Sequence, residues 1–414
     1  MTDELVTWYA NRVVGRLRLD AEARFCFLYE PSWTASADAF PISLSLQFTP
    51  DEVVGGAAHA FFANLLPEGT VRTAVCRRLG ISEANDFALL KAIGGECAGA
   101  LTIASSREKH REEHDYKRLS AKRLQPLVAN EDLVPLLVGG QSTRLSLAGA
   151  QDKLPVAMID GHLHLPLGSS PSTHILKFPN RRYAHLPANE AFVMGFARRL
   201  DLDVVETELY TKTDPACLLV TRYDRRSADS ITRLHQEDFC QALGLLPSTK
   251  YEQEGGPSVA RVAEVTRSHS TSPLVDIRRL VQWQAFNVVS GNSDGHGKNL
   301  SILYDGREVV LAPFYDLLST RHYETLDRKL AMSIGGRRDP DQVLRLQWET
   351  LARDAGLAPK AVLGIIRDLV ERIGETLPVW TAEFRSRNGA GPILQTLPGS
   401  IDKRARSLAR KLGS

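Results

Sequence analysis

The spacing of hydrophobic residues changes along this chain, and the change limits the folds that it can adopt. Apolar and polar residues alternate over Leu5–Tyr9, Val13–Leu19 and Arg24–Glu30, which is the pattern of half-buried strands. After Tyr223 most apolar residues recur at intervals of three and four, which is typical of amphipathic helices. We therefore expect an α+β protein whose strand-rich and helix-rich parts are separate along the chain.

The same patterns, together with turn residues, give the remaining elements. Asp160-Gly161 and Asp305-Gly306 each predict a tight hairpin. Further strands are predicted at Ile42–Phe48, Ala98–Ile103, Lys153–Met158, His162–Pro166, Thr173–Phe178, Val204–Thr211, Ala216–Thr221, Leu300–Tyr304 and Glu308–Leu311. Helices are predicted at Ala57–Leu79 with a break at Pro67, and at Ala84–Ile93, Ala188–Leu200, Gln236–Leu245, Ser258–Thr266, Val275–Ser290, Pro340–Ala355, Lys360–Ile373 and Ile401–Leu412.

The domain organisation follows from these elements and from one charged segment. A chain of 414 residues has room for two or three structural units. The segment Arg107–Arg123 has many charged and few apolar side chains, so we expect it to connect units at the surface. We predict a β-rich subdomain at 1–105, a charged connection at 106–140, a mixed α/β core at 141–223 and a helical region at 224–414.

Composition indicates a soluble protein of the cytoplasm. Hydrophobic residues make up 43% of the chain and charged residues 24%, and the net charge of +2 gives no argument for a surface that binds nucleic acid. This balance does not exclude a local basic patch, and the candidate residues for one are Lys403, Arg404, Arg406, Arg410 and Lys411. No apolar stretch approaches 18 residues, so no membrane span is expected. The five cysteines form no CxxC pair, which favours a reducing compartment.

The stretch Ser293–Asn299 carries the strongest chemical signal. Asp294 and Asn299 lie five positions apart, a predicted hairpin follows them, and Asp316 comes after the hairpin. Protein kinases space their catalytic Asp, an Asn and a metal-binding Asp in this way. A substrate hydroxyl needs a carboxylate to accept its proton, and Mg²⁺ needs oxygen ligands near the phosphates. The spacing therefore predicts phosphoryl transfer.

Two further features fit a nucleotide site. Small residues in Ser146–Lys153 would let backbone N–H groups approach phosphate oxygens, and Lys177 on a strand could pair with the phosphates. Glu190, at the start of the next helix, could hold that lysine. Each feature alone is more often an ordinary turn, a surface lysine or a helix start. Their order along the chain is that of kinases, which favours the nucleotide site. The arginines Arg222, Arg225 and Arg226 fit either a solvated face or phosphate neutralisation.

Several strings in this order resemble the HipA family of serine/threonine kinase toxins from bacterial toxin–antitoxin modules. They are Leu5-Val6-Thr7-Trp8, Phe61–Val71, Ser146–Lys153, Thr173–Pro179, Tyr223-Asp224-Arg225-Arg226, Gln236-Glu237-Asp238, Lys250-Tyr251-Glu252, Gly255-Gly256-Pro257, Ser293–Asn299 and Pro313–Asp316. The resemblance implies a kinase-like two-lobed fold with a β-rich N-terminal subdomain, a mixed α/β N-lobe and a mostly helical C-lobe. It also implies the use of ATP and Mg²⁺.

The resemblance implies a role for individual residues. Asp294 would be the catalytic base, assisted by Lys177 and Asn299, while Asn299 and Asp316 would hold Mg²⁺. Residues that would contact the nucleotide are Ala148, Gly149, Ala150, Gln151, Asp152, Lys153, Lys177, Thr221, Tyr223, His296 and Lys298. The segment Val220–Tyr223 would be the hinge beside the adenine. Ser146 would be autophosphorylated, which would add negative charge to the phosphate loop and inactivate the enzyme. Thr221 stands where the family has an acidic residue, and Gly297 where it has alanine.

The resemblance also implies partners. These are a helix-turn-helix antitoxin similar to HipB, operator DNA reached mainly through that antitoxin, and a protein substrate such as an aminoacyl-tRNA synthetase. Its modification would slow translation and favour persistence, and the complex would repress transcription. Two alternatives are open: a kinase-fold corepressor that acts by binding a DNA-binding antitoxin, and a small-molecule kinase.

Overall fold

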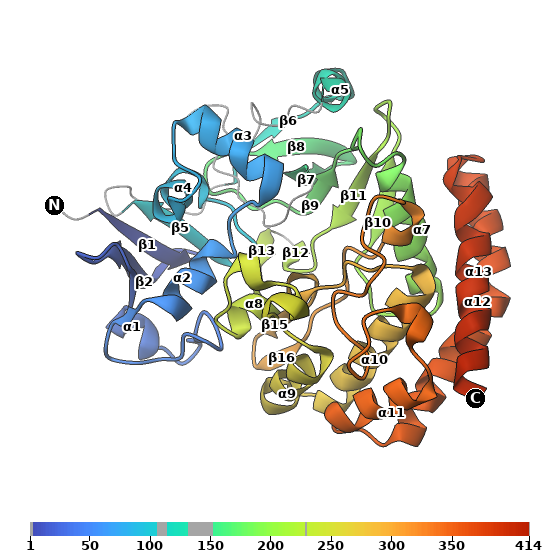
Figure 1. The fold of residues 1–414 in the computed structure, drawn as a ribbon. Coiled ribbons are helices and arrows are strands. Elements are labelled where there is room, and N and C mark those ends of the chain that lie inside the picture. The colour runs from blue at the N-terminus through green and yellow to red at the C-terminus, as the bar shows by residue number, and fades with distance from the viewer. Residues whose placement is uncertain (1–2, 106–113, 131–151, 228–229, 414) are drawn as a thin grey trace. The chain divides into compact units, whose positions relative to one another are not determined.

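The computed structural model describes residues 3–105, 114–130, 152–227 and 230–413 (Figure 1). Contacts divide the chain into two units, each made of several segments. The first consists of Met1–Pro179, Tyr210–Thr249 and Leu303–Arg307, and the second of Asn180–Leu209, Lys250–Ile302 and Glu308–Ser414. The two units are described separately below.

The first unit begins with a five-stranded antiparallel sheet of order β4-β3-β2-β1-β5. Leu5, Leu17 and Phe27 lie opposite one another on its three central strands and are fully buried. They belong to one core cluster with Phe61 and Phe62 of α2, so the alternating pattern puts one face of the sheet against helices. The elements are β1 (Glu4–Tyr9), β2 (Arg12–Leu19), β3 (Phe25–Tyr29), α1 (Pro31–Thr34), β4 (Val53–Val54), α2 (Gly56–Ala63), α3 (Gly69–Leu79), α4 (Asp86–Ile93) and β5 (Leu101–Ser105).

A second sheet of the first unit has strands in the order β11-β9-β7-β8-β6. Leu154, Val156, Leu176 and Phe178 are buried in the same core cluster as the first sheet, so the two sheets share one hydrophobic core. The hairpin predicted at Asp160-Gly161 is confirmed, since Ile159 pairs with His162 across it. The elements are β6 (Tyr116–Arg118), α5 (Ala121–Asn130), β7 (Lys153–Ile159), β8 (His162–Pro166), β9 (His174–Lys177), β11 (Cys217–Thr221), β12 (Arg225–Ser227), β13 (Ile231–Arg233), β14 (His235–Asp238), α8 (Phe239–Ala242) and η1 (Pro247–Thr249).

Two predicted elements of this unit are wrong. Ile42–Phe48 forms no strand beyond an isolated bridge between Ser43 and Leu46. Its backbone is satisfied by side chains instead, since the Tyr29 hydroxyl accepts from the Ile42 N–H at 2.9 Å and donates to the Leu46 carbonyl at 2.5 Å.

The second error is the helix expected at Gln236–Leu245. The segment starts as strand β14, and the helix begins only after Asp238. The Asp238 carboxylate accepts from the Cys240 and Gln241 N–H groups, and the Gln241 side chain accepts from the Asp238 N–H. This capping box fixes the start of α8.

The second unit is mostly helical, and α10 packs against α9, α12 and α13 (Figure 1). The long helix α12 continues to Asn388, well beyond the predicted end at Ile373. The elements of the second unit are α7 (Leu186–Arg199), β10 (Thr207–Tyr210), η2 (Glu252–Glu254), α9 (Val259–His269), α10 (Pro273–Ser290), η3 (Gly297–Asn299), β15 (Ser301–Asp305), β16 (Glu308–Leu311), η4 (Thr320–His322), η5 (Pro340–Gln342), α11 (Arg345–Asp354), α12 (Pro359–Asn388) and α13 (Ile393–Gly413). The last residues of β10 and β15 belong to the first unit.

The described part of the chain holds no helix with both the length and the apolar character that crossing a membrane requires.

Candidate functional site

The loop that carries Asp294 starts where α10 ends. Gly291 follows the last residue of α10 and has a φ of 74°, a left-handed conformation in which glycine stops a helix at little cost. The Asn292 side chain then donates to the Asn287 side chain at 3.0 Å and accepts from the Asp294 N–H at 3.1 Å. The end of α10 therefore sets the position of the Asp294 backbone.

The Asp294 side chain is exposed, and its carboxylate is held by a neighbour that had no predicted role. Tyr251 donates its hydroxyl to Asp294 Oδ1 at 2.8 Å, and its ring meets the His296 ring edge-on with centroids 5.1 Å apart. The Gly297 N–H donates to the Lys250 carbonyl at 3.1 Å, which ties the segment before η2 to the loop. Tyr251 belongs to one of the strings that carry the family resemblance, and this was the only sequence signal for it.

Asn299 and Asp316 meet in the second unit, although they are 17 positions apart. Asn299 Nδ2 donates to Asp316 Oδ2 at 2.9 Å, while Asn299 Oδ1 accepts from the His296 N–H at 3.1 Å. Asp316 has a φ of 61°, which a residue with a side chain adopts at some cost and which is often found at functional sites. Hydrogen bonds from Tyr315 to Lys298 O and between the Tyr315 and Ser301 hydroxyls, both 2.7 Å, hold the two segments together.

The Asn299–Asp316 pair is better suited to binding Mg²⁺ than to binding a metal whose ligands are all protein side chains. Among the described residues there is no group of three or more His, Cys, Asp or Glu side chains that could hold a metal. Mg²⁺ is usually bound by one or two protein oxygens, with water and substrate phosphates completing the shell. Asn299 Oδ1 has a second lone pair, and Asp316 offers a carboxylate, so the two residues fit such a partial shell.

His296 and Lys298, which were predicted to contact nucleotide, lie in the same loop with largely buried side chains. Their main-chain groups make hydrogen bonds that stabilise the loop. The His296 N–H donates to Asn299 Oδ1, and the Lys298 carbonyl accepts from the Tyr315 hydroxyl. Their contact with nucleotide remains a prediction.

Lys177 and Lys153 lie side by side in the first unit. They are directly opposite one another on the antiparallel strands β9 and β7, so their side chains leave the same face of the sheet. Leu154 and Leu176 form the next pair and point to the other face, into the core. Both side chains can therefore contact one anionic group at this face. Asp152 precedes this pair, and its carbonyl accepts from the Phe178 N–H at 2.9 Å.

The rest of the predicted phosphate loop, Ala148, Gly149, Ala150 and Gln151, lies outside the described residues, and so does Ser146.

Two predicted hinge residues lie at the end of β11 in the first unit: Thr221 is the last residue of the strand, and Tyr223 comes two positions later. Thr221 is half-buried and pairs with His174 of β9, while the Tyr223 hydroxyl donates to Gln236 Oε1 at 2.7 Å. The Arg222 N–H between them donates to the Thr173 carbonyl at 3.0 Å. Main-chain hydrogen bonds therefore hold this segment in place.

A buried ionic cluster anchors this hinge segment. Glu96, which is fully buried, accepts from Arg222 and Arg225 at 2.8 Å and from Arg233 at 2.6 Å. Arg222 also donates to Asp224 at 2.7 Å.

Although burial alone would raise the pKa of Glu96, the charges of these arginines hold that pKa well below its ordinary range. Both readings of Arg222 and Arg225 as solvated or phosphate-neutralising residues are therefore wrong: their charges are balanced inside the protein. Arg226 is exposed and pairs with Asp305.

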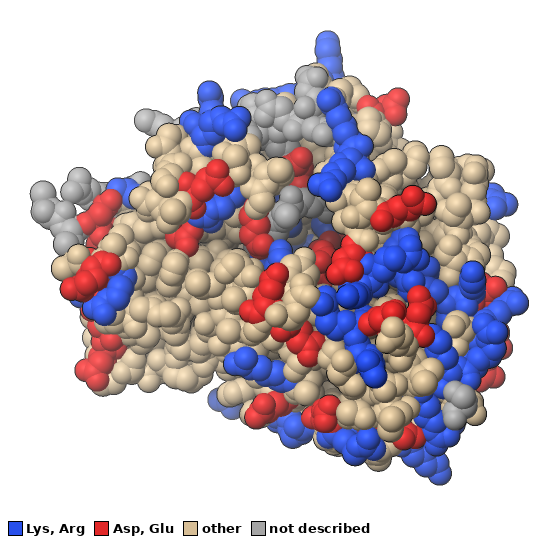
Figure 2. All heavy atoms as spheres, in the orientation of Figure 1, with Lys and Arg blue, Asp and Glu red and all other residues tan. Residues whose placement is uncertain are grey.

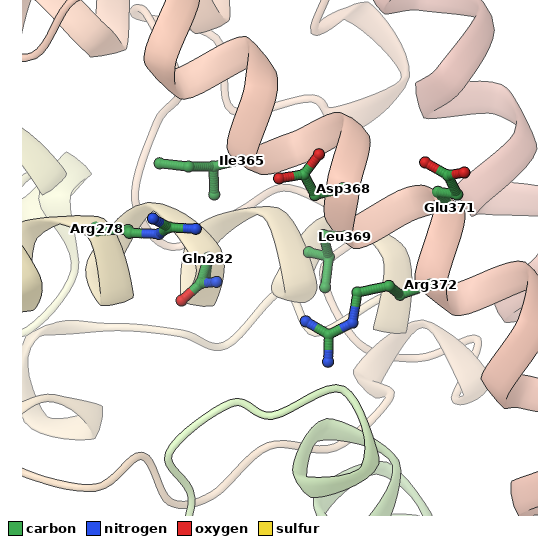
Figure 3. Close-up of a pocket in the computed structure, with 7 residues that line it drawn as sticks. All are labelled: Arg278, Gln282, Ile365, Asp368, Leu369, Glu371 and Arg372. Atoms are coloured by element: carbon green, nitrogen blue, oxygen red, sulfur yellow. The ribbon is translucent and has the colours of Figure 1, made fainter.

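A pocket of about 300 Å³ lies between α10 and α12 and holds none of the predicted site residues. Figure 3 shows its lining side chains: Arg278, Gln282, Ile365, Asp368, Leu369, Glu371 and Arg372. Charges of both signs line it, so it offers no clear preference for an anion such as a phosphate group.

Fold and site together define a class of protein. The strand-rich unit carries two lysines on one sheet face, and the helical unit carries an exposed aspartate in the same loop as Asn299, which bonds to Asp316. This is the set of groups that kinase-like α+β proteins use for phosphoryl transfer.

Comparison with known proteins identifies the family. The HipA N-terminal domain matches residues 5–104, and the HipA-like C-terminal domain matches residues 145–377. The chain therefore belongs to the HipA family, whose members include kinase toxins, and the predicted resemblance is confirmed.

Individual relatives agree with this result. The chain is 40% identical to the Sinorhizobium fredii protein named "Putative kinase Y4mE", over 90% of each chain. It is 29% identical to the serine/threonine-protein kinase toxin HipA of Shewanella oneidensis, over 88% of this chain and 86% of the toxin. The structure matches HipA in a Shewanella oneidensis complex of HipA, HipB and operator DNA with a TM-score of 0.85, 27% identity and coverage of 99% and 98%. The predicted α+β kinase-like fold is thus confirmed.

Proposed function

We propose that this protein is an ATP-dependent serine/threonine protein kinase that acts as the toxin of a toxin–antitoxin pair. The observation that carries the proposal is the loop of the second unit, where exposed Asp294 lies five residues before the Asn299–Asp316 pair. Membership of the HipA family, with relatives named as kinases, supports it.

Asp294 is proposed to be the general base. Its carboxylate accepts the proton of a serine or threonine hydroxyl while that oxygen forms a bond to the γ-phosphorus of ATP. The bond between the γ-phosphorus and the bridging oxygen breaks, and ADP leaves with that oxygen. Tyr251, which donates to Asp294 Oδ1, orients the carboxylate. Asn299 and Asp316 would hold Mg²⁺, which neutralises phosphate charge when bound.

Lys177 and Lys153 are proposed to contact the phosphates of ATP, because they place two cations on one sheet face. Asp152, Thr221, Tyr223, His296 and Lys298 complete the proposed nucleotide contacts.

Segment 148–151 is proposed as the phosphate loop, and Ser146 as the site of autophosphorylation. A phosphate there would add about −1.5 to −2 charges beside a loop that must bind anionic ATP, so we expect it to inactivate the enzyme.

The proposed partners follow from the relative of known structure. Because Shewanella oneidensis HipA occurs in a complex with HipB and operator DNA, we propose a helix-turn-helix antitoxin for this protein and operator contact mainly through it. The proposed substrate is a cytoplasmic protein such as an aminoacyl-tRNA synthetase. Its modification would slow translation and lead to persistence, and the antitoxin complex would repress transcription.

Phosphate transfer from γ-labelled ATP in the presence of Mg²⁺ tests the proposal. We expect the wild-type protein to label itself or an added bacterial protein extract, and Asp294→Ala to label neither. Asp354→Ala, which removes an exposed carboxylate at the end of α11, is the matched control and should label normally. Equal labelling by the wild type and Asp294→Ala would refute the proposed chemistry. Tight antitoxin binding without nucleotide binding would favour the corepressor, and turnover of a metabolite would favour a small-molecule kinase.

A further inference from the structure

The last helix, α13, contacts the place where α10 passes into the catalytic loop. It begins at Ile393 and so lies outside residues 145–377, which match the HipA-like C-terminal domain. Its residues Leu397, Ile401, Leu408 and Leu412 are buried and form one stripe that packs it against its neighbours. In Figure 1 this helix runs beside α12, and it also packs against α10.

Arg404 points inward from α13, unlike its neighbours in the predicted basic patch. Lys403, Arg406 and Arg410 are exposed, and Figure 2 shows basic side chains over the surface of the C-terminal helices. The Arg404 guanidinium instead donates from Nε to the Val289 carbonyl at 2.8 Å and from Nη2 to the Ser290 carbonyl at 2.7 Å. These two carbonyls end α10 and have no partner within the helix.

The contact suits arginine specifically. A guanidinium presents parallel donors to two neighbouring acceptors, and its positive charge is favourable at the negative end of a helix dipole. Burial lowers the pKa of Arg404 to about 10, so the group still carries its charge at neutral pH. The guanidinium also covers Gly291, where a β-carbon would approach Arg404 Cζ to 2.8 Å.

A second link from α13 reaches the same loop. Lys411 donates to the Asp341 carbonyl at 2.8 Å, and the Asp341 side chain binds Arg321 at 3.0 Å. The Arg321 N–H in turn donates to the Gly291 carbonyl at 3.0 Å. Both links thus end at residues 289–291, three to five positions before Asp294.

We propose that Arg404 is a positioning residue for the catalytic loop, so that α13 holds Asp294 in the geometry that phosphoryl transfer needs. This inference rests on the proposed function of Asp294. Positional errors of about 1 Å at a reacting group can cost about a hundredfold in rate. Nucleotide affinity should be affected less, because the proposed nucleotide contacts other than His296 and Lys298 lie in the first unit.

The test compares Arg404→Gln and Arg404→Lys with Arg406→Gln, a control on the same helix whose exposed side chain pairs with Asp402. Two quantities are measured on the full chain: kcat and KM for ATP, and amide hydrogen exchange across residues 291–299. In the loop, the Ser293 N–H is held by Thr320 Oγ1 at 2.7 Å and the Gly297 N–H by the Lys250 carbonyl at 3.1 Å, so loosening is measurable.

We expect Arg404→Gln to lower kcat about 10- to 100-fold with little change in KM, and to speed exchange in the loop only. Arg404→Lys should recover part of both, and Arg406→Gln should match the wild type. Wild-type kcat and wild-type loop exchange in Arg404→Gln would overturn the inference. If Arg404→Gln does not fold, the kinetic constants and the loop exchange of Arg404→Lys decide whether Arg404 positions the loop. If the wild type transfers no phosphate, the proposed function fails, and the exchange data alone decide whether Arg404 positions the loop.

Discussion

Replacing Glu96 with glutamine removes the negative charge that three buried arginines share. Arg222 and Arg225 donate to Glu96 Oε1, and Arg233 donates to Oε2 at 2.6 Å. Glutamine keeps one acceptor oxygen, but its amide nitrogen would bring a donor against a donor of an arginine. Asp224 would remain for its pairs with Arg222 and Arg225.

The expected cost follows from the burial of all partners. The Glu96 side chain is 0% exposed and those of the three arginines are 1–4% exposed, so solvent cannot compensate for the lost charge. Breaking a buried ion pair by removing one partner costs about 3–5 kcal/mol. For a domain of about 150–250 residues this corresponds to a fall in the unfolding midpoint of about 6–20 °C.

The pH dependence of this effect has a definite sign. The folded-state pKa of Glu96 is lowered, so its contribution to stability is present above the ordinary carboxyl pKa and is lost only as pH falls through the lowered value. The difference between Glu96→Gln and the wild type is therefore fully developed at pH 7.

Thermal unfolding at pH 7 measures the difference. The control is Glu22→Gln, which removes an exposed carboxylate that pairs with exposed Arg24 and should leave the midpoint unchanged. If Glu96→Gln unfolds at the same temperature as Glu22→Gln, the cluster does not anchor the hinge segment and the reasoning fails.

Three further predictions use other contacts. Tyr251→Phe should lower kcat about tenfold with little change in KM for ATP, because it removes the hydrogen bond to Asp294, and unchanged steady-state kinetics would contradict this. Burial raises the pKa of Glu237 to about 7, so stability should fall by about 3 kcal/mol as pH rises from about 4.5 to 7, and Glu237→Gln should flatten that fall in urea unfolding. Gly195→Ala should cost about 1–3 kcal/mol in urea unfolding, since its β-carbon would meet a tryptophan ring of α12 at 2.4 Å. Gly364→Ala, with open space at the same position, should not destabilise the protein.

Local patterns predicted much of the fold because they depend on neighbours in the chain. The alternation at Leu5–Tyr9 and the turn at Asp160-Gly161 appear as β1 and as the β7–β8 hairpin. Ile42–Phe48 shows the same alternation, yet its backbone bonds to distant side chains, including Glu237, which accepts from the Leu44 N–H at 2.9 Å. A pattern within seven residues carries no information about such a partner.

Some features of the candidate site were likewise predictable from the sequence, and others were not. Asn299 and Asp316 were expected to meet because a predicted hairpin separates them, and they lie in hydrogen-bond contact. Glu96 and Arg404 had no such signal, since Glu96 lies 126 positions from Arg222, and Arg404 lies 115 positions from the Val289 carbonyl that it caps. Arg404 was visible only as one member of a basic run, and its inward direction depends on the packing of α13.

Asp294 is proposed to act in phosphoryl transfer and not in nucleotide binding. ATP affinity and the rate of phosphate transfer, measured on the same preparations of wild type and Asp294→Asn, test it most directly. We expect similar ATP affinity in both proteins and phosphate transfer at least about 100-fold slower in the variant. Equal transfer rates at equal ATP affinity would contradict it.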